Sequence, residues 1–197
     1  QSQDTLETRL YAWFGERYFA VDRRVLGLFR IAFGVVLLID VLRRLPHAAM
    51  FYSDAGVLPV DMARAHPLSD PNISLFFALS STREAQLGLL ALAAVYILYL
   101  VGYRTKLAQA AALIGFCSLN SRNLLVENRG YIEISIILVW TLFLPLGDRY
   151  SVDARRPRHR AGLNREPYVS LVVLALTLQL AAIYLFNAVQ KHGPTWD

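Results

Sequence analysis

The stretch YVSLVVLALTLQLAAIYLFNAVQKHGPTW, residues 168–196, decides the fold. No charged residue occurs from residue 168 to residue 189, and about 20 apolar residues are enough for a helix to cross a bilayer. Polar side chains interrupt its second half, and the helical period places Tyr184, Asn187 and Lys191 on one face. Such a stripe is costly in lipid unless it faces other helices or a cavity. The stretch therefore predicts a membrane-spanning helix whose polar face ends in a lysine amine.

The composition favours a membrane protein over a soluble one. The chain has 197 residues, of which 55% are hydrophobic and 18% are charged, whereas a soluble domain carries about 25% charged residues. Its mean hydropathy is +0.38. The net charge is +5, and much of the positive excess lies in residues 147–166, which is typical of a topology signal. No basic patch interleaved with aromatic residues occurs, so we predict no nucleic-acid partner.

The apolar runs predict five membrane spans joined by polar segments. An amphipathic helix at the membrane surface is expected within residues 1–24, where aromatic and charged side chains alternate. The connection 45–82 is too long for a simple loop, and we expect short helices at 59–65 and 72–79, the second capped by Asn72. The spans are expected at residues 25–42, 85–101, 107–119, 131–146 and 168–189.

We expect a single all-α domain over residues 1–197, with a five-span bundle at 25–189. Residues 190–197 then begin a segment on the outer face. The first residue is Gln1 and the chain stops at Asp197, directly after the polar stripe, so we expect further chain on both sides.

The distribution of Arg and Lys predicts the orientation. With the N-terminus in the cytoplasm, the inner segments hold more Arg and Lys than the outer segments do. The positive-inside rule therefore favours a cytoplasmic N-terminus. This orientation places the loop around Asp54, the turn around Asn128 and the amine of Lys191 on the same, non-cytoplasmic face.

Lys191 is the candidate catalytic residue. An ammonium group in water has a pKa of about 10.4, and partial desolvation lowers that pKa. A lysine that caps an apolar cavity is suited to take a proton from a lipid-soluble acid such as a hydroquinone. Tyr184 and Asn187 would form hydrogen bonds with that ligand. The alternative role for Lys191 is an interfacial anchor at the end of a span.

Polar residues in two outer segments are candidates for ligand contact. Arg122, Asn123 and Asn128 lie between two predicted spans and would line a polar pocket, or else belong to a solvated loop. Asp54 is expected to anchor a turn. None of the four histidines has metal-ligand spacing, so we predict no metal site.

Two charged residues fall inside the first span. Asp40 is expected to pair with Arg43 or Arg44, which follow it by three and four residues. Arg30 is expected to reach the membrane surface or to meet a partner within the bundle.

Five segments resemble one membrane-protein family. They are FRIAFGVVLLIDVLRRL (29–45), FYSDAGVLP (51–59), SLNSRNLLVENRGY (118–131), FLPLGDRYSVD (143–153) and QLAAIYLFNAVQKHGPTW (179–196). Together they resemble the horizontally transferred transmembrane (HTTM) domain, which is the membrane part of vitamin K-dependent γ-carboxylase and its bacterial relatives. The resemblance implies a helical membrane protein with its active face outside the cytoplasm, here in a bacterial inner or plasma membrane.

The resemblance also implies a chemistry. In the carboxylase a lysine five residues before a tryptophan deprotonates reduced vitamin K, and Lys191 stands five residues before Trp196. Tyr184 matches an aromatic position of the same helix. Gly130 stands where the carboxylase has a histidine, and Gln190 replaces the first residue of its lysine pair.

Two functions follow from these observations. One is a carboxylase-like enzyme that uses a quinone or hydroquinone cofactor, with membrane lipid around it and a protein or peptide substrate on the non-cytoplasmic face. The other is a non-catalytic membrane subunit, either of a larger complex or of secreted-peptide maturation.

Overall fold

The structure is a computed structural model that describes residues 19–65, 73–126, 128–156 and 168–190. The chain divides into two compact units, unit 1 (Gln1–Arg23 with Asn164–Asp197) and unit 2 (Arg24–Leu163). The helix predicted at the membrane surface falls almost entirely on residues outside the described part of the chain.

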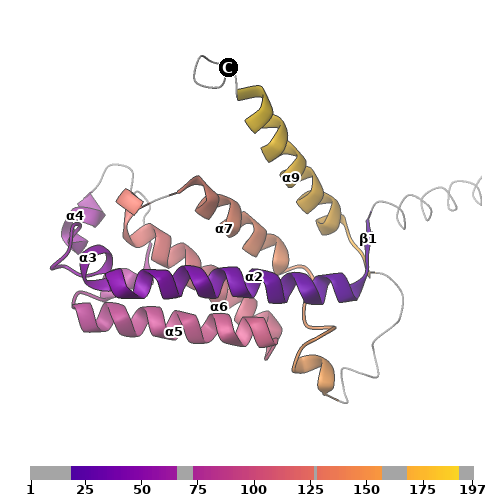
Figure 1. Cartoon of the computed structure of the whole chain (residues 1–197), viewed down its shortest axis with the longest axis horizontal. Coiled ribbons are helices and arrows are strands. Elements are labelled where there is room, and N and C mark those ends of the chain that lie inside the picture. Colours follow the sequence, from indigo (N-terminus) through magenta and orange to yellow (C-terminus); the bar gives the residue numbers. More distant parts are fainter. Residues whose placement is uncertain (1–18, 66–72, 127, 157–167, 191–197) are drawn as a thin grey trace, which may run out of the picture. The chain divides into compact units, whose positions relative to one another are not determined.

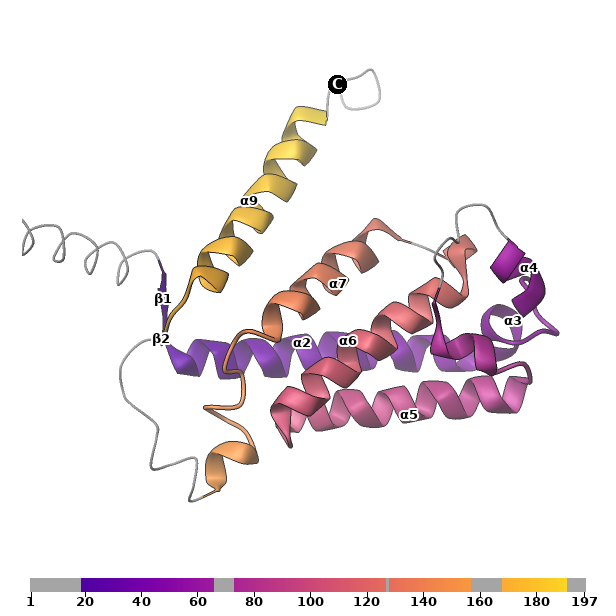
Figure 2. The ribbon, with the colours of Figure 1, turned by 180° about the vertical axis from the view of Figure 1, so that it is seen from behind.

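The described part of unit 2 is built on four long helices that alternate in direction (Figures 1 and 2). Helix α5 packs against α6, and α6 packs against α7. Helix α2 approaches α5 closely at Gly34, where an added Cβ would lie 3.0 Å from the Cβ of Leu100. Small residues permit such close helix contacts in membranes. The four helices are α2 (Arg23–Arg44), α5 (Thr82–Val101), α6 (Thr105–Arg122) and α7 (Arg129–Thr141).

The alternating helices give unit 2 two ends, which we name after an aspartate at each. The Asp54 end comprises residues 45–81 and the α6–α7 turn, and the Asp153 end comprises the α5–α6 turn and residues 142–156. The short elements of the Asp54 end are η1 (Leu45–His47), α3 (Ala48–Tyr52), α4 (Val60–Ala65), η3 (Leu75–Ala78) and η4 (Leu124–Val126), and η5 (Asp153–Arg155) lies at the Asp153 end.

Three helices of the described chain are long and apolar enough to cross a membrane, namely Arg23–Tyr52, Thr82–Val101 and Leu171–Gln190. They coincide with the first, second and fifth predicted spans. Helices α6 and α7 rise by about 27 Å and about 20 Å at 1.5 Å per residue. Both are shorter than the hydrocarbon core, which is about 30 Å thick.

The core of unit 2 lies where the four helices face one another. Leu37, Leu89, Phe116 and Leu138, one from each helix, are at most 1% exposed. On the outward faces of α2 and α5, large apolar side chains remain exposed, and a bilayer would solvate them without cost. These outward side chains include Val36, Ile39, Leu42, Leu87, Leu90 and Ile97.

The side chain of Arg30 is completely buried near the Asp153 end and binds the chain after α7. Its Nη1 donates to the carbonyl of Leu146 at 3.1 Å, and its Nη2 donates to the carbonyl of Tyr150 at 2.6 Å. The expectation that Arg30 meets a partner in the bundle is confirmed. Backbone carbonyls thus accept hydrogen bonds from both terminal nitrogens of this buried guanidinium, without a direct carboxylate contact, while its Nε has no partner among the described residues.

Helix α7 ends earlier than predicted. The sequence predicts a span over residues 131–146, whereas the helix ends at Thr141 and is followed by turns through Leu144. Pro145 disfavours helical backbone at the residue before it. The early end leaves backbone carbonyls without partners in the helix. The Lys106 ammonium of α6 donates hydrogen bonds to two of them, the carbonyls of Leu142 and Leu144, at 2.6 and 2.8 Å.

Within unit 1, a two-stranded antiparallel pair precedes helix α9 (Leu171–Gln190), so the fold is not purely helical. Strand β1 (Ala20–Val21) pairs with β2 (Tyr168–Val169). The predicted helix start at residue 168 is therefore wrong by three residues. Ser170 supplies the reason, because its hydroxyl accepts a hydrogen bond from the Val172 N–H and so begins the helix after the strand.

The connection 45–82 contains short helices near the predicted positions. Helix α4 confirms the helix expected at 59–65, and η3 falls within the one expected at 72–79. The cap of η3 is Ser74, whose hydroxyl accepts from the Phe76 N–H at 3.1 Å. The predicted cap, Asn72, lies outside the described residues.

Candidate functional site

A pocket of about 550 Å³ opens at the Asp54 end of unit 2. The end of α2, the segment after it and the start of α7 surround this pocket. Four polar side chains come from a single helical face, because positions 40, 43, 44 and 47 follow the helical period. The lining residues are Asp40, Arg43, Arg44, His47, Phe51, Tyr52, Val126, Asn128 and Tyr131.

Arg44 is the central side chain of this pocket and is only 9% exposed. Its Nη1 donates to the Tyr52 hydroxyl at 2.9 Å, and its Nε lies 2.9 Å from a carboxylate oxygen of Asp40. The expected local pair of Asp40 with an arginine is thus confirmed. The guanidinium carbon also lies 4.6 Å from the centre of the Tyr131 ring, within cation–π distance.

The second guanidinium nitrogen of Arg44, Nη2, is buried, and no described residue accepts a hydrogen bond from it. Buried polar groups in native proteins nearly always have a partner, and a charged donor that lacks one is especially costly. The exposed side chains of Arg43 and His47, which line the same pocket, offer further donors to a ligand oxygen.

The start of α7 brings Asn128 and Tyr131 to the pocket. Asn128 is the N-cap of α7, and its side-chain oxygen accepts from the Gly130 N–H at 3.0 Å. The Tyr131 ring packs edge-on against Phe116 of α6, with 6.0 Å between ring centres. A side-chain amide and an aromatic ring are therefore fixed at one wall.

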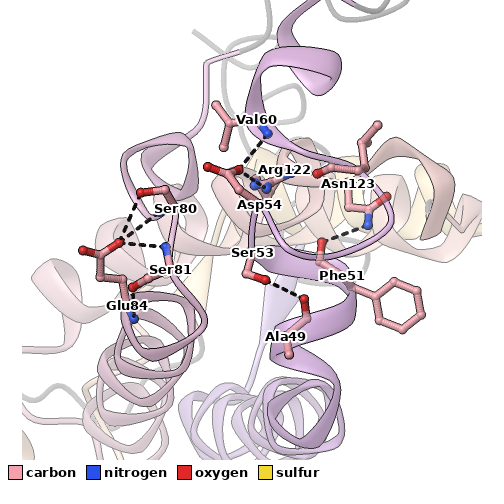
Figure 3. A network of polar contacts seen from close by, with 11 residues as sticks. Ala49, Phe51, Ser53, Asp54, Val60, Ser80, Ser81, Glu84, Arg122 and Asn123 are labelled. Carbon is pink, nitrogen blue, oxygen red and sulfur yellow. Dashed lines mark hydrogen bonds and ion pairs between the residues drawn. The ribbon is translucent and has the colours of Figure 1, made fainter.

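Arg122 and Asn123, two predicted ligand contacts, hold the loops behind the pocket (Figure 3). The buried Arg122 guanidinium donates to the Leu58 carbonyl at 2.8 Å and lies 3.6 Å from a carboxylate oxygen of Asp54. Asn123 donates its side-chain N–H to the Phe51 carbonyl at 2.9 Å. Both side chains thus bind the segment that supplies the pocket residues on α3.

Asp54 anchors its loop, as expected from the sequence. Its carboxylate accepts from the Val60 N–H at 2.9 Å, which fixes the start of α4, and its own N–H donates to the Ser80 carbonyl at 2.9 Å (Figure 3). The next helix, α5, begins with a capping box between Ser81 and Glu84. The Asp54 end is therefore a connected polar framework.

The remaining predicted site residues belong to unit 1. Tyr184 and Asn187 are exposed on α9, three residues apart and hence on one helical face, and Tyr184 is 75% exposed. Lys191, the candidate base, lies outside the described residues.

Sequence reasoning did not bring Arg44, Tyr52 and Tyr131 together in one site. One signal was present, because the polar residues at positions 40, 43, 44 and 47 share a face at the end of a membrane-length helix. The contribution of Tyr131, which lies 87 positions after Arg44 in the numbering, required the folded bundle.

Comparisons of this chain with protein-family models, with curated proteins and with solved structures found no match. Among the described residues, no group of three His, Cys, Asp or Glu side chains could hold a metal ion.

Proposed function

We propose that this chain is a multi-pass membrane protein of the HTTM, γ-carboxylase-like type that binds a quinol-like lipid in the pocket around Arg44. The observation that carries the proposal is the lining of this pocket, where the cationic Arg43 and Arg44 and the aromatic Tyr131 meet at the end of a membrane-length helix.

The chemistry of the pocket matches a quinol head group. The ring oxygens of a quinone or quinol accept hydrogen bonds from a guanidinium, and the flat ring stacks on aromatic side chains such as Tyr131 and Phe51. A volume of about 550 Å³ falls within the range of small-molecule sites, which is about 300–1,000 Å³. A lipid-soluble ligand would enter from the bilayer at the end of α2.

In the proposed topology all five predicted segments span the membrane, with the N-terminus in the cytoplasm. The alternating directions of α2, α5, α6 and α7 support this arrangement. The short α7 would be accommodated by the turns that continue its path to Leu146, or by local thinning of the bilayer. The Asp54 end then faces away from the cytoplasm.

The proposed catalytic role of Lys191 is supported by the sequence resemblance alone. A lysine base would remove a proton from the quinol, and the resulting anion would react with dioxygen as the oxidant. This reaction would start carboxylation or a related oxidation, with a protein or peptide substrate on the non-cytoplasmic face. If Lys191 has no such role, the chain is a non-catalytic membrane subunit of a larger complex or of peptide maturation.

The experiment is photolabelling of the reconstituted full chain with an azidoquinone, followed by mass spectrometry. We expect labelled peptides from residues 40–52 or 126–131, and labelling about fivefold weaker in Tyr131→Leu, because one ring contact contributes about 1 kcal/mol. The control Tyr103→Leu removes a tyrosine from the Asp153 end. Equal labelling of both variants would contradict the pocket assignment.

The same preparation tests Lys191 through quinol oxidation. Lys191→Ala should keep the photolabelling and lose at least about a hundredfold in turnover, which is the usual effect of removing a general base. Lys191→Arg keeps the charge but cannot accept a proton, so it should behave like Lys191→Ala. Unchanged turnover in both variants would contradict the role of Lys191, and the absence of turnover in the unsubstituted chain would leave the non-catalytic function.

A further inference from the structure

A second pocket, of about 570 Å³, opens at the Asp153 end of unit 2. It lies between the α5–α6 turn and the chain that follows α7, at the opposite end of the helices from the pocket around Arg44. Three cationic side chains, Arg104, Lys106 and Arg156, contribute to its wall. The remaining lining residues are Thr105, Leu107, Pro145, Gly147, Asp148 and Asp153.

The carboxylate of Asp153 is already engaged by the protein. It accepts from the N–H of Arg104 at 3.1 Å, and from the N–H and hydroxyl of Thr105 at 2.7 and 2.8 Å. These donors form the N-terminus of α6, where a negative charge is favourable. The negative charge of Asp153 therefore stabilises the helix N-terminus. The lining holds three cationic side chains against the two carboxylates of Asp148 and Asp153.

Lys106 is held in place before any ligand arrives. Its ammonium donates to the carbonyls of Leu142 and Leu144, which leaves one of its three protons for another acceptor. Burial lowers the pKa of Lys106, and the nearby carboxylate of Asp148 partly opposes that change. A second anionic group beside the ammonium would stabilise the charged form.

Arg156 and Arg104 are exposed cations on the rim of the pocket. The Arg156 guanidinium lies 5.4 Å from the centre of the Tyr103 ring and 3.9 Å from a carboxylate oxygen of Asp153, so its position is defined on two sides. Arg104 adopts a left-handed backbone conformation, with a φ of 44°, directly before α6. Both side chains are exposed and therefore accessible to a phosphate.

In the proposed topology the pocket would lie at the depth of lipid head groups. Helix α5 is long enough to cross the membrane and ends at Val101, three residues before Arg104. An apolar side chain, Leu107, is 64% exposed beside the cations, and Pro145 completes the apolar part of the wall. Cationic groups next to apolar surface at this depth match a phosphate joined to a glycerol and acyl chains.

From these contacts we propose that the pocket at the Asp153 end binds the phosphate of an anionic phospholipid. The proposal goes beyond the proposed quinol function and does not depend on it. Basic pockets between helices on the cytoplasmic side of membrane proteins bind such head groups. The bound lipid would join the α5–α6 turn to the chain after α7.

The test is native mass spectrometry of the full chain released from nanodiscs that contain phosphatidylglycerol or phosphatidylcholine. We expect the chain to retain phosphatidylglycerol in preference to phosphatidylcholine. The double variant Arg104→Gln, Arg156→Gln should retain about tenfold less phosphatidylglycerol, because two cations near the phosphate are lost. The matched control Arg64→Gln, Arg83→Gln removes two exposed cations from the Asp54 end and α5 start and should retain the lipid normally.

Two further arms identify the ligand. Arg104→Lys, Arg156→Lys keeps both charges and should retain the lipid, which separates a charge effect from a fold effect. Inorganic phosphate in excess should not displace the lipid, because it lacks the glycerol and acyl part. Equal retention in the Gln variant and its control, or full displacement by free phosphate, would overturn the proposal.

Discussion

Arginine side chains buried in unit 2 connect segments that are far apart in the sequence. Arg30, Arg44 and Arg122 are at most 9% exposed, and each donates to a carbonyl or hydroxyl oxygen of another segment. A guanidinium presents five donors in a fixed plane, so one buried arginine can satisfy several backbone carbonyls at once. In apolar surroundings the cost of leaving those donors unpaired is high, which makes these contacts specific.

Asp153 gives a residue-scale prediction about pH. Burial acts to raise the pKa of this carboxyl, but the hydrogen bonds from Thr105 and Arg104 outweigh it and lower the pKa below its ordinary value of about 3.9. A lowered pKa means that the ionised carboxylate stabilises the fold above about pH 4 and that this contribution disappears as the pH falls through the folded-state pKa.

We expect Asp153→Asn to lower the free energy of unfolding at pH 7 by about 1–2 kcal/mol, because hydrogen bonds to a charged acceptor are lost. The difference from the unsubstituted protein should shrink below about pH 4. Chemical unfolding of the reconstituted protein at pH 7 and below about pH 4 measures this difference in unfolding free energy. Asp61→Asn, at an exposed carboxylate of α4, is the control. A difference that is the same at both pH values would show that the charge of Asp153 does not contribute.

At the scale of single elements, the ends of α5 show how local signals and packing combine. Ser81 and Glu84 form a capping box at its start, and Gly102 ends it in the left-handed conformation with a φ of 69°. An added Cβ at position 102 would overlap the Arg30 guanidinium and the Cβ of Ser151. The glycine is required both by the backbone conformation and by the close packing of Arg30.

Gly102→Ala is therefore expected to lower the free energy of unfolding by about 2–4 kcal/mol, from the left-handed backbone together with overpacking. Gly130→Ala is the matched control, because a Cβ there would meet only the Asn128 side chain, at 3.6 Å. Thermal unfolding of both variants in the same lipid measures the difference. If the two variants are equally stable, the packing of Arg30 against the end of α5 is wrong.

For the whole molecule, the number of membrane spans depends on whether α6 and α7 cross the bilayer. They pack in the bundle with α5, yet by length and composition only Arg23–Tyr52, Thr82–Val101 and Leu171–Gln190 qualify as spans among the described helices. A bundle partner can be shorter or more polar than a lipid-facing helix, because its neighbours satisfy its polar groups.

Cysteine accessibility in intact cells distinguishes five spans from three. In a Cys117→Ser background, Ala55→Cys should react with a membrane-impermeant maleimide from outside, and Val152→Cys should react only after the membrane is opened. The deciding position is residue 125, in the α6–α7 turn, where the Leu125 side chain is 64% exposed. It is tested with Leu125→Cys. Five spans predict labelling of Leu125→Cys from outside, and protection of this position in intact cells would reduce the number of spans to three.

Local features of this protein were predictable from the sequence by itself. Apolar runs placed the four long helices of unit 2 to within a few residues, apart from the early end of α7 at Thr141. The pair of Asp40 with Arg44 followed from their four-residue spacing, since neighbours on one helical face meet regardless of the rest of the fold. Helix period and length are properties of a segment alone, and so the sequence expresses them directly.

Only the tertiary structure decided which polar groups meet. Arg122 binds the Leu58 carbonyl 64 positions away, Arg30 binds the Tyr150 carbonyl 120 positions away, and Tyr131 closes the pocket on Arg44. The period of a helix states which face is buried but not which partner that face contacts. The contacts that build both pockets arise from helix order and crossing, because the packing of whole helices sets those distances.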